Sequence, residues 1–198
     1  MTSDFTPAPL IPALDFANRQ IPAHGTMGVD YEQRVDFHRL RDYRLNRALE
    51  ALEASECGAF LLFDFYNIRY TTQTWIGGAL GDKMSRYALL MPDGKPHIWD
   101  FGSAAKHHRL FSPWIHDGHS HAGMLGLRGA IHPDVGLMKE AVTMIKGMLT
   151  DAGVADDPIG VDIVEPAFLF EMQAQGLKVV DIQQHMLDAR AIKSADEI

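Results

Sequence analysis

The spacing of apolar residues changes several times along the chain, and each change predicts a new structural element. Apolar residues recur at helical spacing up to about residue 54, at positions Leu45, Ala48, Leu49 and Leu52. Asp30, with Gln33 three residues later, resembles the capping pattern that begins a helix. A continuous apolar run over 59–63 then predicts a buried central strand, and the aromatic and β-branched residues of 67–72 predict a second short extended segment.

The middle of the chain contains the clearest hairpin pattern. Two apolar segments, 87–91 and 96–99, flank the turn sequence Pro92-Asp93-Gly94, in which proline fixes φ and glycine accepts a positive φ. Residues 103–110 predict a short helix, for which we expect Asp100 to act as the cap, and a polar stretch follows to about residue 128.

The second half of the chain alternates between helix and strand patterns. Pro133 suits the first turn of a helix that ends near Gly153, and its apolar face would carry Met138, Ala141, Val142, Ile145, Met148 and Leu149. Residues 159–163 predict a strand, Pro166 opens a helix to about residue 175, and 177–180 predict a last strand. Alternating strands and helices predict an α/β domain, and the hairpin makes its β-sheet mixed.

Composition narrows the class of protein. The chain has 198 residues, 46% of them hydrophobic, which suffices for one domain with a real core. The 18 Lys and Arg against 26 Asp and Glu give 18 − 26 = −8, a charge that argues against nucleic-acid binding. The apolar runs are too short to span a membrane, and the N-terminus lacks the pattern of a secretory signal. A single cysteine, Cys57, excludes an internal disulfide and favours a cytoplasmic location.

Two segments predict surface features rather than core elements. Residues 1–29 hold four of the ten prolines without a clear period, and predict an N-terminal arm. The first helix would have a basic, solvated outer side formed by Arg34, Arg39, Arg41, Arg44 and Arg47.

Several motifs suggest chemistry without completing a site. Six histidines fall within a short region, but their spacing matches no known metal-ligand pattern, so we interpret this region as a polar surface loop: His107, His108, His116, His119, His121 and His132. The tripeptide Asp100-Phe101-Gly102 occurs without the other parts of a protein kinase, and the glycine-rich segment 77–81 matches no phosphate-binding loop. We interpret Cys57 as a buried structural thiol.

Four other residues are candidates for a binding site. Asp64 and Asp162 each follow an apolar strand, where a carboxylate can line a site or cap the next element, and the sequence leaves both roles open. Trp75 and Arg86 flank the glycine-rich segment and could together bind a carboxylate ligand, although simple packing and pairing is the more economical interpretation.

Three stretches carry a resemblance to a known family. Residues 58–64 with 67–70, residues 86–90, and the terminal run 187–198 resemble the N-terminal domain of the "pita-bread" metallopeptidase-like family, which includes creatinase, prolidase, aminopeptidase P and related dimethylsulfoniopropionate lyases. The resemblance covers residues 31–198. It implies a ribonuclease H-like creatinase N-terminal domain over 30–184, with 185–198 as the linker and start of a catalytic domain.

The resemblance also implies where the chemistry lies. The family's catalytic domain binds two divalent metal ions (Mn, Co, Zn or Fe) through two aspartates, one histidine and two glutamates. None of these ligands can be assigned here, so we expect no catalytic residue, no metal and no activity from this chain alone. The resemblance further implies a homodimer, and it places Arg86 at or within one position of the arginine that binds the substrate carboxylate in creatinase.

Three functions remain open from the sequence. The first is the substrate-shaping, oligomerising domain of a Xaa-Pro dipeptidase-like metallohydrolase, acting on a dipeptide. The second is the same scaffold in a dimethylsulfoniopropionate lyase or creatinase-like enzyme, where the aromatic rings of Trp75, Tyr70 or Tyr66 would suit a sulfonium or quaternary nitrogen. The third is a stand-alone interaction module without catalysis.

Overall fold

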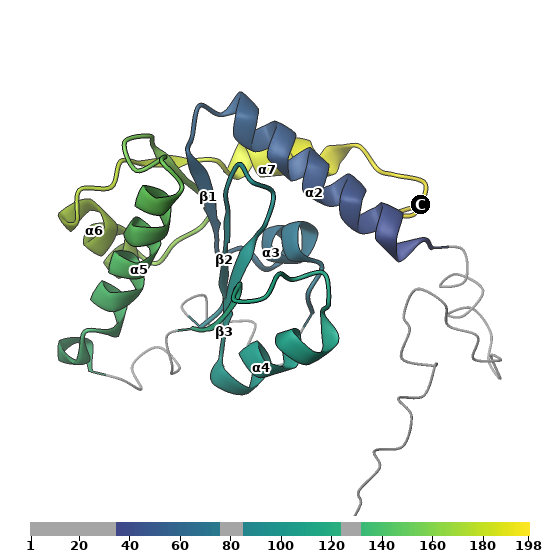
Figure 1. Ribbon diagram of the computed structural model, residues 1–198. Coiled ribbons are helices and arrows are strands. Elements are labelled where there is room, and N and C mark those ends of the chain that lie inside the picture. The colour runs from purple at the N-terminus through teal and green to yellow at the C-terminus, as the bar shows by residue number, and fades with distance from the viewer. Residues whose placement is uncertain (1–34, 76–84, 124–131) are drawn as a thin grey trace, which may run out of the picture. The chain divides into compact units, whose positions relative to one another are not determined.

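The computed structural model describes residues 35–75, 85–123 and 132–198, which belong to two compact units (Figure 1). The larger unit is Arg44–Ile192, and the smaller unit joins the residues up to Tyr43 with Lys193–Ile198. The predicted arm, the capping pattern at Asp30, Arg34 and the glycine-rich segment 77–81 lie outside the described residues.

A mixed six-stranded sheet forms the centre of the larger unit. Its strands run in the order β4 (Ser120–Ala122), β3 (His97–Asp100), β2 (Tyr87–Leu90), β1 (Ala59–Leu62), β5 (Ile159–Val161) and β6 (Val179–Asp181). Strand β2 is antiparallel to both of its neighbours, whereas the other pairs are parallel. The predicted α/β fold with a mixed sheet is confirmed, and so is the hairpin, in which Gly94 has the expected positive φ of 70°.

Alternation along β1 divides the core between the two faces of the sheet. Leu61 and its neighbours pack against α5 (Leu137–Asp151) and α6 (Pro166–Ala174). Phe60 and Leu62 pack against side chains from α3 (Phe65–Thr72), α7 (Gln183–Ala191) and the part of α2 (Phe37–Ala54) that lies in this unit. Figure 1 shows α5 and α6 on one side of the strands, and α3 and α7 on the other. None of the helices in the described ranges is long and apolar enough to cross a membrane.

The predicted helices are mostly confirmed, with shifted beginnings. Helix α2 begins at Phe37, where the Asp36 carboxylate accepts hydrogen bonds from the backbone N–H groups of His38 and Arg39. The predicted short helix is α4 (Gly102–Phe111). The prediction that Pro133 opens the long helix is wrong, because Pro133–Val135 forms a separate 3₁₀ turn and Gly136, at φ 81°, redirects the chain into α5.

The structure corrects two strand predictions. Residues 67–72 are helical in α3 rather than extended, because Asp64 caps this helix and the aromatic and β-branched side chains are buried by packing. Strand β4 lies within the stretch that we predicted to be a polar loop. It pairs with β3 at the edge of the sheet, where its histidine remains only partly buried, so its sequence lacks a continuous apolar run.

Helix α7 contributes to the larger unit. Its Met186 and Ala189 side chains are buried, and the unit extends to Ile192. The predicted division at residue 184 therefore lies at the beginning of this helix.

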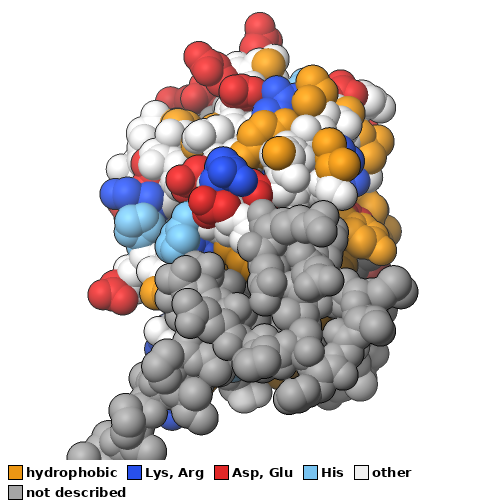
Figure 2. Space-filling model, turned by 90° about the vertical axis from the view of Figure 1, so that its right-hand side faces the viewer, with side chains coloured by type: hydrophobic (Ala, Val, Ile, Leu, Met, Phe, Trp, Pro, Cys, Tyr) orange, Lys and Arg blue, Asp and Glu red, His pale blue; other side chains and the backbone are white. Residues whose placement is uncertain are grey.

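Ion pairs neutralise arginines of the predicted basic surface. In the smaller unit, Arg39 forms a two-pronged contact with Asp196, at 2.7 Å from Nε to Oδ2 and 2.6 Å from Nη2 to Oδ1. This contact lowers the pKa of the Asp196 carboxyl. In the larger unit, Arg47 pairs with Glu50 at 2.7 Å. On the surface drawn in Figure 2, basic side chains likewise lie beside acidic ones.

Candidate functional site

Two carboxylates fix the beginning of α3. Asp64 accepts hydrogen bonds from the backbone N–H groups of Tyr66 and Asn67, at 2.9 and 3.1 Å. Asp162, which follows β5, accepts from the backbone of Phe63 and Asp64 and from the Asn67 side chain. Burial raises the pKa of Asp162, and these hydrogen bonds oppose the rise. Of the two roles that the sequence left open, the described contacts give both aspartates the structural one.

The chain reverses after α3 and returns Trp75 to the exposed side of that helix. Gln73 has the left-handed conformation, with φ 47°. The Trp75 ring lies edge-on to Phe65, with 4.6 Å between ring centroids and 75° between planes. The Arg69 guanidinium lies over the Trp75 ring, 4.6 Å from its centroid. Trp75 nevertheless remains 53% exposed, so it offers an aromatic surface at this end of the helix.

Arg86 lies close to the same aromatic residue but is buried. Its Nη2 atom donates to the backbone oxygen and the hydroxyl of Thr74, at 2.9 and 2.8 Å. Its guanidinium carbon is 5.6 Å from the centroid of the Phe65 ring. Burial lowers the pKa of Arg86, while the charge of Asp100 opposes this shift. The structure thus gathers Trp75 and Arg86 around Phe65, with Trp75 facing solvent and Arg86 holding the residue before Trp75.

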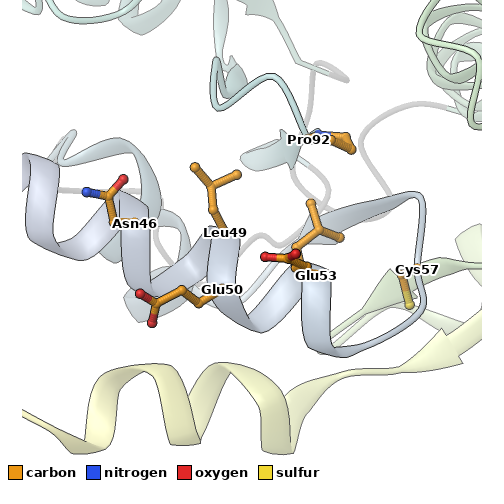
Figure 3. A pocket seen from close by; sticks show the side chains of 7 residues that line it. Asn46, Leu49, Glu50, Glu53, Cys57 and Pro92 are labelled. Atoms are coloured by element: carbon orange, nitrogen blue, oxygen red, sulfur yellow. The ribbon is translucent and has the colours of Figure 1, made fainter.

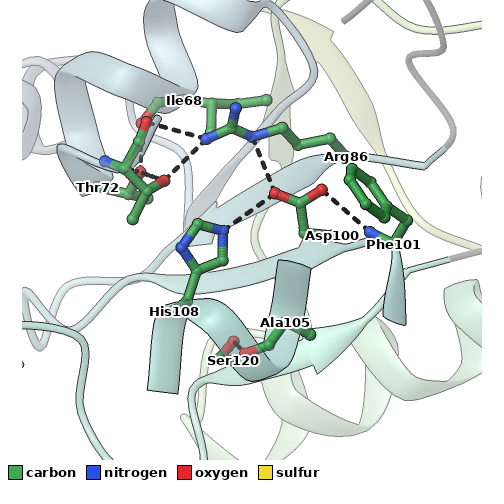
Figure 4. Close-up of polar contacts among 9 residues, drawn as sticks. Ile68, Thr72, Arg86, Asp100, Phe101, Ala105, His108 and Ser120 are labelled. Carbon is green, nitrogen blue, oxygen red and sulfur yellow. Dashed lines mark hydrogen bonds and ion pairs between the residues drawn. The ribbon is translucent and has the colours of Figure 1, made fainter. Parts of the chain in front are cut away.

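Asp100 and His108 continue this network into the interior (Figure 4). The Asp100 Oδ2 atom lies 3.0 Å from His108 Nε2 and 3.4 Å from Arg86 Nε, and both the Asp100 and His108 side chains are 1% exposed. The predicted role of Asp100 as a helix cap is wrong, because α4 begins after Phe101 without a side-chain cap. The carboxylate instead turns inward toward the side-chain nitrogens of His108 and Arg86, where it connects β3, α4 and the entrance to β2.

Tyr70, the third predicted binding residue, occupies a packing position. It is buried in the core cluster that includes side chains from α2 and α7. Its hydroxyl donates to the backbone oxygen of Ala189 at 3.0 Å. Tyr70 therefore connects α3 to α7 in this structure instead of presenting its ring to a ligand.

The histidine-rich region contains a buried histidine and a stacked histidine group rather than one surface loop. His108 is buried against Asp100, as described above. His97 of β3 stacks on His119 at 3.7 Å between ring centroids, and its Nδ1 lies 3.0 Å from Nε2 of His121 on β4. Burial is the main cause that lowers the pKa of both His97 and His121 to about 4, and the neighbouring His119 imidazole contributes to this lowering. Within the described ranges, no group of three or more His, Cys, Asp or Glu side chains is placed to hold a metal ion.

A separate pocket of about 570 Å³ lies beside α2 and the hairpin turn (Figure 3). Its lining residues are Asn46, Leu49, Glu50, Leu52, Glu53, Cys57 and Pro92. Cys57 is half-buried here rather than fully buried as predicted. None of the three predicted binding residues lines this pocket, so it is distinct from the cluster around Phe65.

Three members of the cluster were not identified from sequence as site residues. Phe65 and Arg69 lie in or next to residues 67–72, which we predicted to be extended. They share a face only because this segment is the helix α3. His108 was grouped with the other histidines, whereas in the structure it lies on α4 and its Nε2 atom is 3.0 Å from Asp100 at the end of β3. A helical reading of 65–72 would have placed Phe65 and Arg69 on one face, four residues apart.

Comparison with known proteins identifies one relative by sequence. No family model matches the chain. The chain is 26% identical over 168 residues to the dimethylsulfoniopropionate lyase DddP of Roseovarius nubinhibens, a match that covers 82% of this chain and 36% of the lyase. The chain thus spans about a third of the length of this curated relative.

Solved structures share the fold at lower sequence identity. The Xaa-Pro dipeptidase from Bacillus anthracis matches with a TM-score of 0.54 and 12% identity, over 79% of this chain and 38% of that chain. The N-terminal domain of the cytoplasmic peptidase PepQ from Mycobacterium tuberculosis H37Rv matches with a TM-score of 0.51 and 16% identity, over 74% of this chain and 98% of that chain. The resemblance carried by the sequence is confirmed: this chain has the α/β fold of the N-terminal domain of the pita-bread metallopeptidase-like family.

Proposed function

We propose that this chain is the substrate-shaping N-terminal domain of a metal-dependent enzyme, and that dimethylsulfoniopropionate is its first candidate substrate. The observation that carries the proposal is the sequence similarity to a dimethylsulfoniopropionate lyase along 82% of the chain. The dipeptidases support only the scaffold, because a likeness at 12–16% identity concerns the fold and not the substrate. The sequence relative therefore moves the lyase ahead of the dipeptidase that we favoured from sequence.

The residues present do not fit the metal centre that the family implies. A pair of divalent ions needs several convergent carboxylate and imidazole ligands, and the described parts of the chain place no three such side chains together. We therefore assign no metal-dependent step to these residues. Their contribution in this proposal is to bind and orient a substrate that a metal-binding domain would convert.

The cluster around Phe65 supports such a contribution. Arg86 binds both the backbone oxygen and the hydroxyl of Thr74, so it fixes the backbone directly before Trp75. Trp75 in turn exposes about half of its surface. A fixed, exposed indole next to arginines can form one wall of a site for a small molecule that carries a carboxylate.

Hydrolysis of a Xaa-Pro dipeptide is the second candidate. The fold of the Xaa-Pro dipeptidase from Bacillus anthracis favours it, and a dipeptide also carries a carboxylate that an arginine could recognise. The two candidates differ in the remainder of the ligand, which is a sulfonium group in one and a peptide in the other.

Activity assays separate the candidates. The longest product encoded in one reading frame with this chain should be purified with manganese, iron or cobalt, and tested for release of dimethyl sulfide and acrylate and for hydrolysis of Ala-Pro. We expect dimethyl sulfide release, and we expect Trp75→Ala to raise KM more than it lowers kcat. Phe170→Ala, which removes an exposed aromatic ring from α6, is the matched control and should leave both constants unchanged. Dipeptide hydrolysis alone would establish the second candidate. If neither activity is detected, that result would support a non-catalytic interaction module.

We also propose that the chain forms a homodimer, as the resemblance implies. Light scattering after size-exclusion chromatography should give twice the 22.0 kDa mass of the chain. A monomeric mass at micromolar concentration would remove oligomerisation from the proposed function while leaving substrate shaping open.

A further inference from the structure

The exposed side of α3 carries an arginine whose guanidinium has no carboxylate partner among the described residues. Arg69 is exposed, and its side-chain contact is with the ring of Trp75. Other arginines of the chain differ in this respect, since Arg39 binds Asp196 and Arg47 binds Glu50. In a chain with a net charge of −8, an exposed guanidinium that contacts an aromatic ring, and no acid in the part of the chain that the structure describes, is available to an external anion.

The surroundings of Arg69 hold its guanidinium in place. The guanidinium lies 4.6 Å from the centroid of the Trp75 ring, and Trp75 is itself held edge-on against Phe65. A guanidinium that lies over an aromatic ring can still direct N–H groups outward from its edge, in the planar arrangement that matches a carboxylate. Because the side chain is already ordered by this contact, binding a carboxylate would cost less conformational entropy than at a free arginine.

Arg86 is less suited to this task than Arg69. Its side chain is 7% exposed, it already binds Thr74, and it lies 3.4 Å from the Asp100 carboxylate. Solvent reaches Arg69, whereas Arg86 supports the cluster from within. Arg69 therefore faces solvent, whereas Arg86 fixes the backbone at Thr74.

We infer that Arg69, held over Trp75, is a specificity-determining residue that binds the carboxylate of a small ligand. The exposed rings of Tyr66 and Trp75 would contact the apolar part of that ligand. The inference rests on the proposed function, because dimethylsulfoniopropionate and Xaa-Pro dipeptides share a carboxylate. It also changes the expected role of Trp75, since a guanidinium already lies over the ring that we predicted would receive a sulfonium or ammonium group.

Nuclear magnetic resonance on the 198-residue chain tests this inference without requiring catalysis. Propionate supplies the carboxylate probe and trimethylsulfonium the cation probe, at low ionic strength so that charge screening is small. We expect propionate to shift the Nε–H signal of Arg69 and the indole N–H signal of Trp75, and trimethylsulfonium to shift neither. Arg69→Gln should raise the dissociation constant for propionate by about tenfold.

Two further variants make the outcome specific. Arg69→Lys keeps the charge but loses the planar pair of donors, so we expect propionate affinity between those of the parent chain and Arg69→Gln. Arg47→Gln removes an arginine that is paired with Glu50 on α2 and should leave the affinity unchanged. A shift of Trp75 by trimethylsulfonium alone, or equal propionate affinity in the parent chain and Arg69→Gln, would overturn the inference.

The two proposals can fail separately. Propionate binding through Arg69 without any lyase or dipeptidase activity of the longer product would contradict the proposed function and keep the carboxylate site. Activity that persists with unchanged KM in Arg69→Gln would contradict the site and keep the function.

Discussion

Packing between β5 and its neighbours predicts a large cost for adding one methyl group at Gly160. An alanine Cβ at this position would lie 2.6 Å from Ile182 Cγ2 and 2.8 Å from Phe60 Cδ1. Real Cβ atoms essentially never approach other heavy atoms this closely, so a neighbour must move. Phe60 is 0% exposed and Ile182 is 1% exposed, so both side chains are enclosed by the core. Overpacking of this kind costs about 1–3 kcal/mol, and we expect Gly160→Ala to lower the free energy of unfolding by about 2 kcal/mol.

The same substitution in α5 provides a control with the opposite sign. A Cβ added at Gly147 would meet no atom within 4 Å. Gly147 is exposed in the interior of a helix, where alanine is favoured over glycine by about 1 kcal/mol. Gly147→Ala should therefore stabilise the chain by roughly this amount, which separates the two variants by about 3 kcal/mol.

Urea denaturation followed by circular dichroism measures the difference. If the slope m is unchanged, the displacement of each midpoint reports stability directly. For a chain of this size, the free-energy changes correspond to shifts of the melting temperature of about 2–4 °C per kcal/mol. Equal midpoints for Gly160→Ala and the parent chain would refute the reasoning, because they would mean that Phe60 and Ile182 are not closely packed over β5.

Three other changes have signs that follow from individual contacts. Acidification from neutral pH should destabilise the fold, because the pKa values of His97 and His121 are lowered to about 4. The unfolded chain, with imidazole pKa values near 6.5, binds more protons between about pH 6.5 and 4, so the stability present above this window is lost as pH falls, by about 1 kcal/mol after solvent screening. Asp100→Asn leaves the buried Arg86 charge without a carboxylate and should lower stability by about 3 kcal/mol in urea melts. Asp64→Ala removes the cap of α3 and should cost about 1 kcal/mol by the same measurement.

Each of these changes has a matched control. His97→Gln should flatten the dependence of stability on pH in the acid window, and an unchanged slope would assign that slope to other groups. Asp134→Asn replaces a carboxylate that is 91% exposed and should leave stability unchanged, so a loss equal to that of Asp100→Asn would count against the buried network. Asp64→Asn keeps a side chain that caps helices well, and a loss as large as that of Asp64→Ala would argue against capping.

The elements that sequence predicted correctly are those whose signal is local. The run over 59–63 forms β1, and the turn at Pro92-Asp93-Gly94 forms the expected hairpin, because apolar continuity and turn chemistry act over a few residues. The apolar face of α5 was likewise visible, and Val142, Ile145 and Leu149 are buried as predicted. These elements are enough to determine the α/β class and the mixed sheet.

Helix α3 shows where local preference fails. Its residues favour strands, yet Asp64 caps a helix here, and Ile68 and Tyr70 are buried against α2 and α7. That burial depends on α7, which lies more than a hundred residues further along the chain. No property of residues 67–72 alone records the presence of that helix, so propensity gave the wrong secondary structure.

The candidate site has the same dependence on contacts that are distant in sequence. Trp75 and Arg86 were identified because their side chains carry evident chemistry, and the structure does bring them to a common neighbour, Phe65. Which of the arginines is buried could not be predicted, because it depends on Asp100, whose carboxylate turns inward only when β3 pairs with β2. Once Arg86 is held there, Arg69 is the cation that, among the described residues, faces solvent beside Trp75. The assignment of a ligand-facing arginine therefore follows from the sheet pairing, and not from the presence of arginines in the sequence alone.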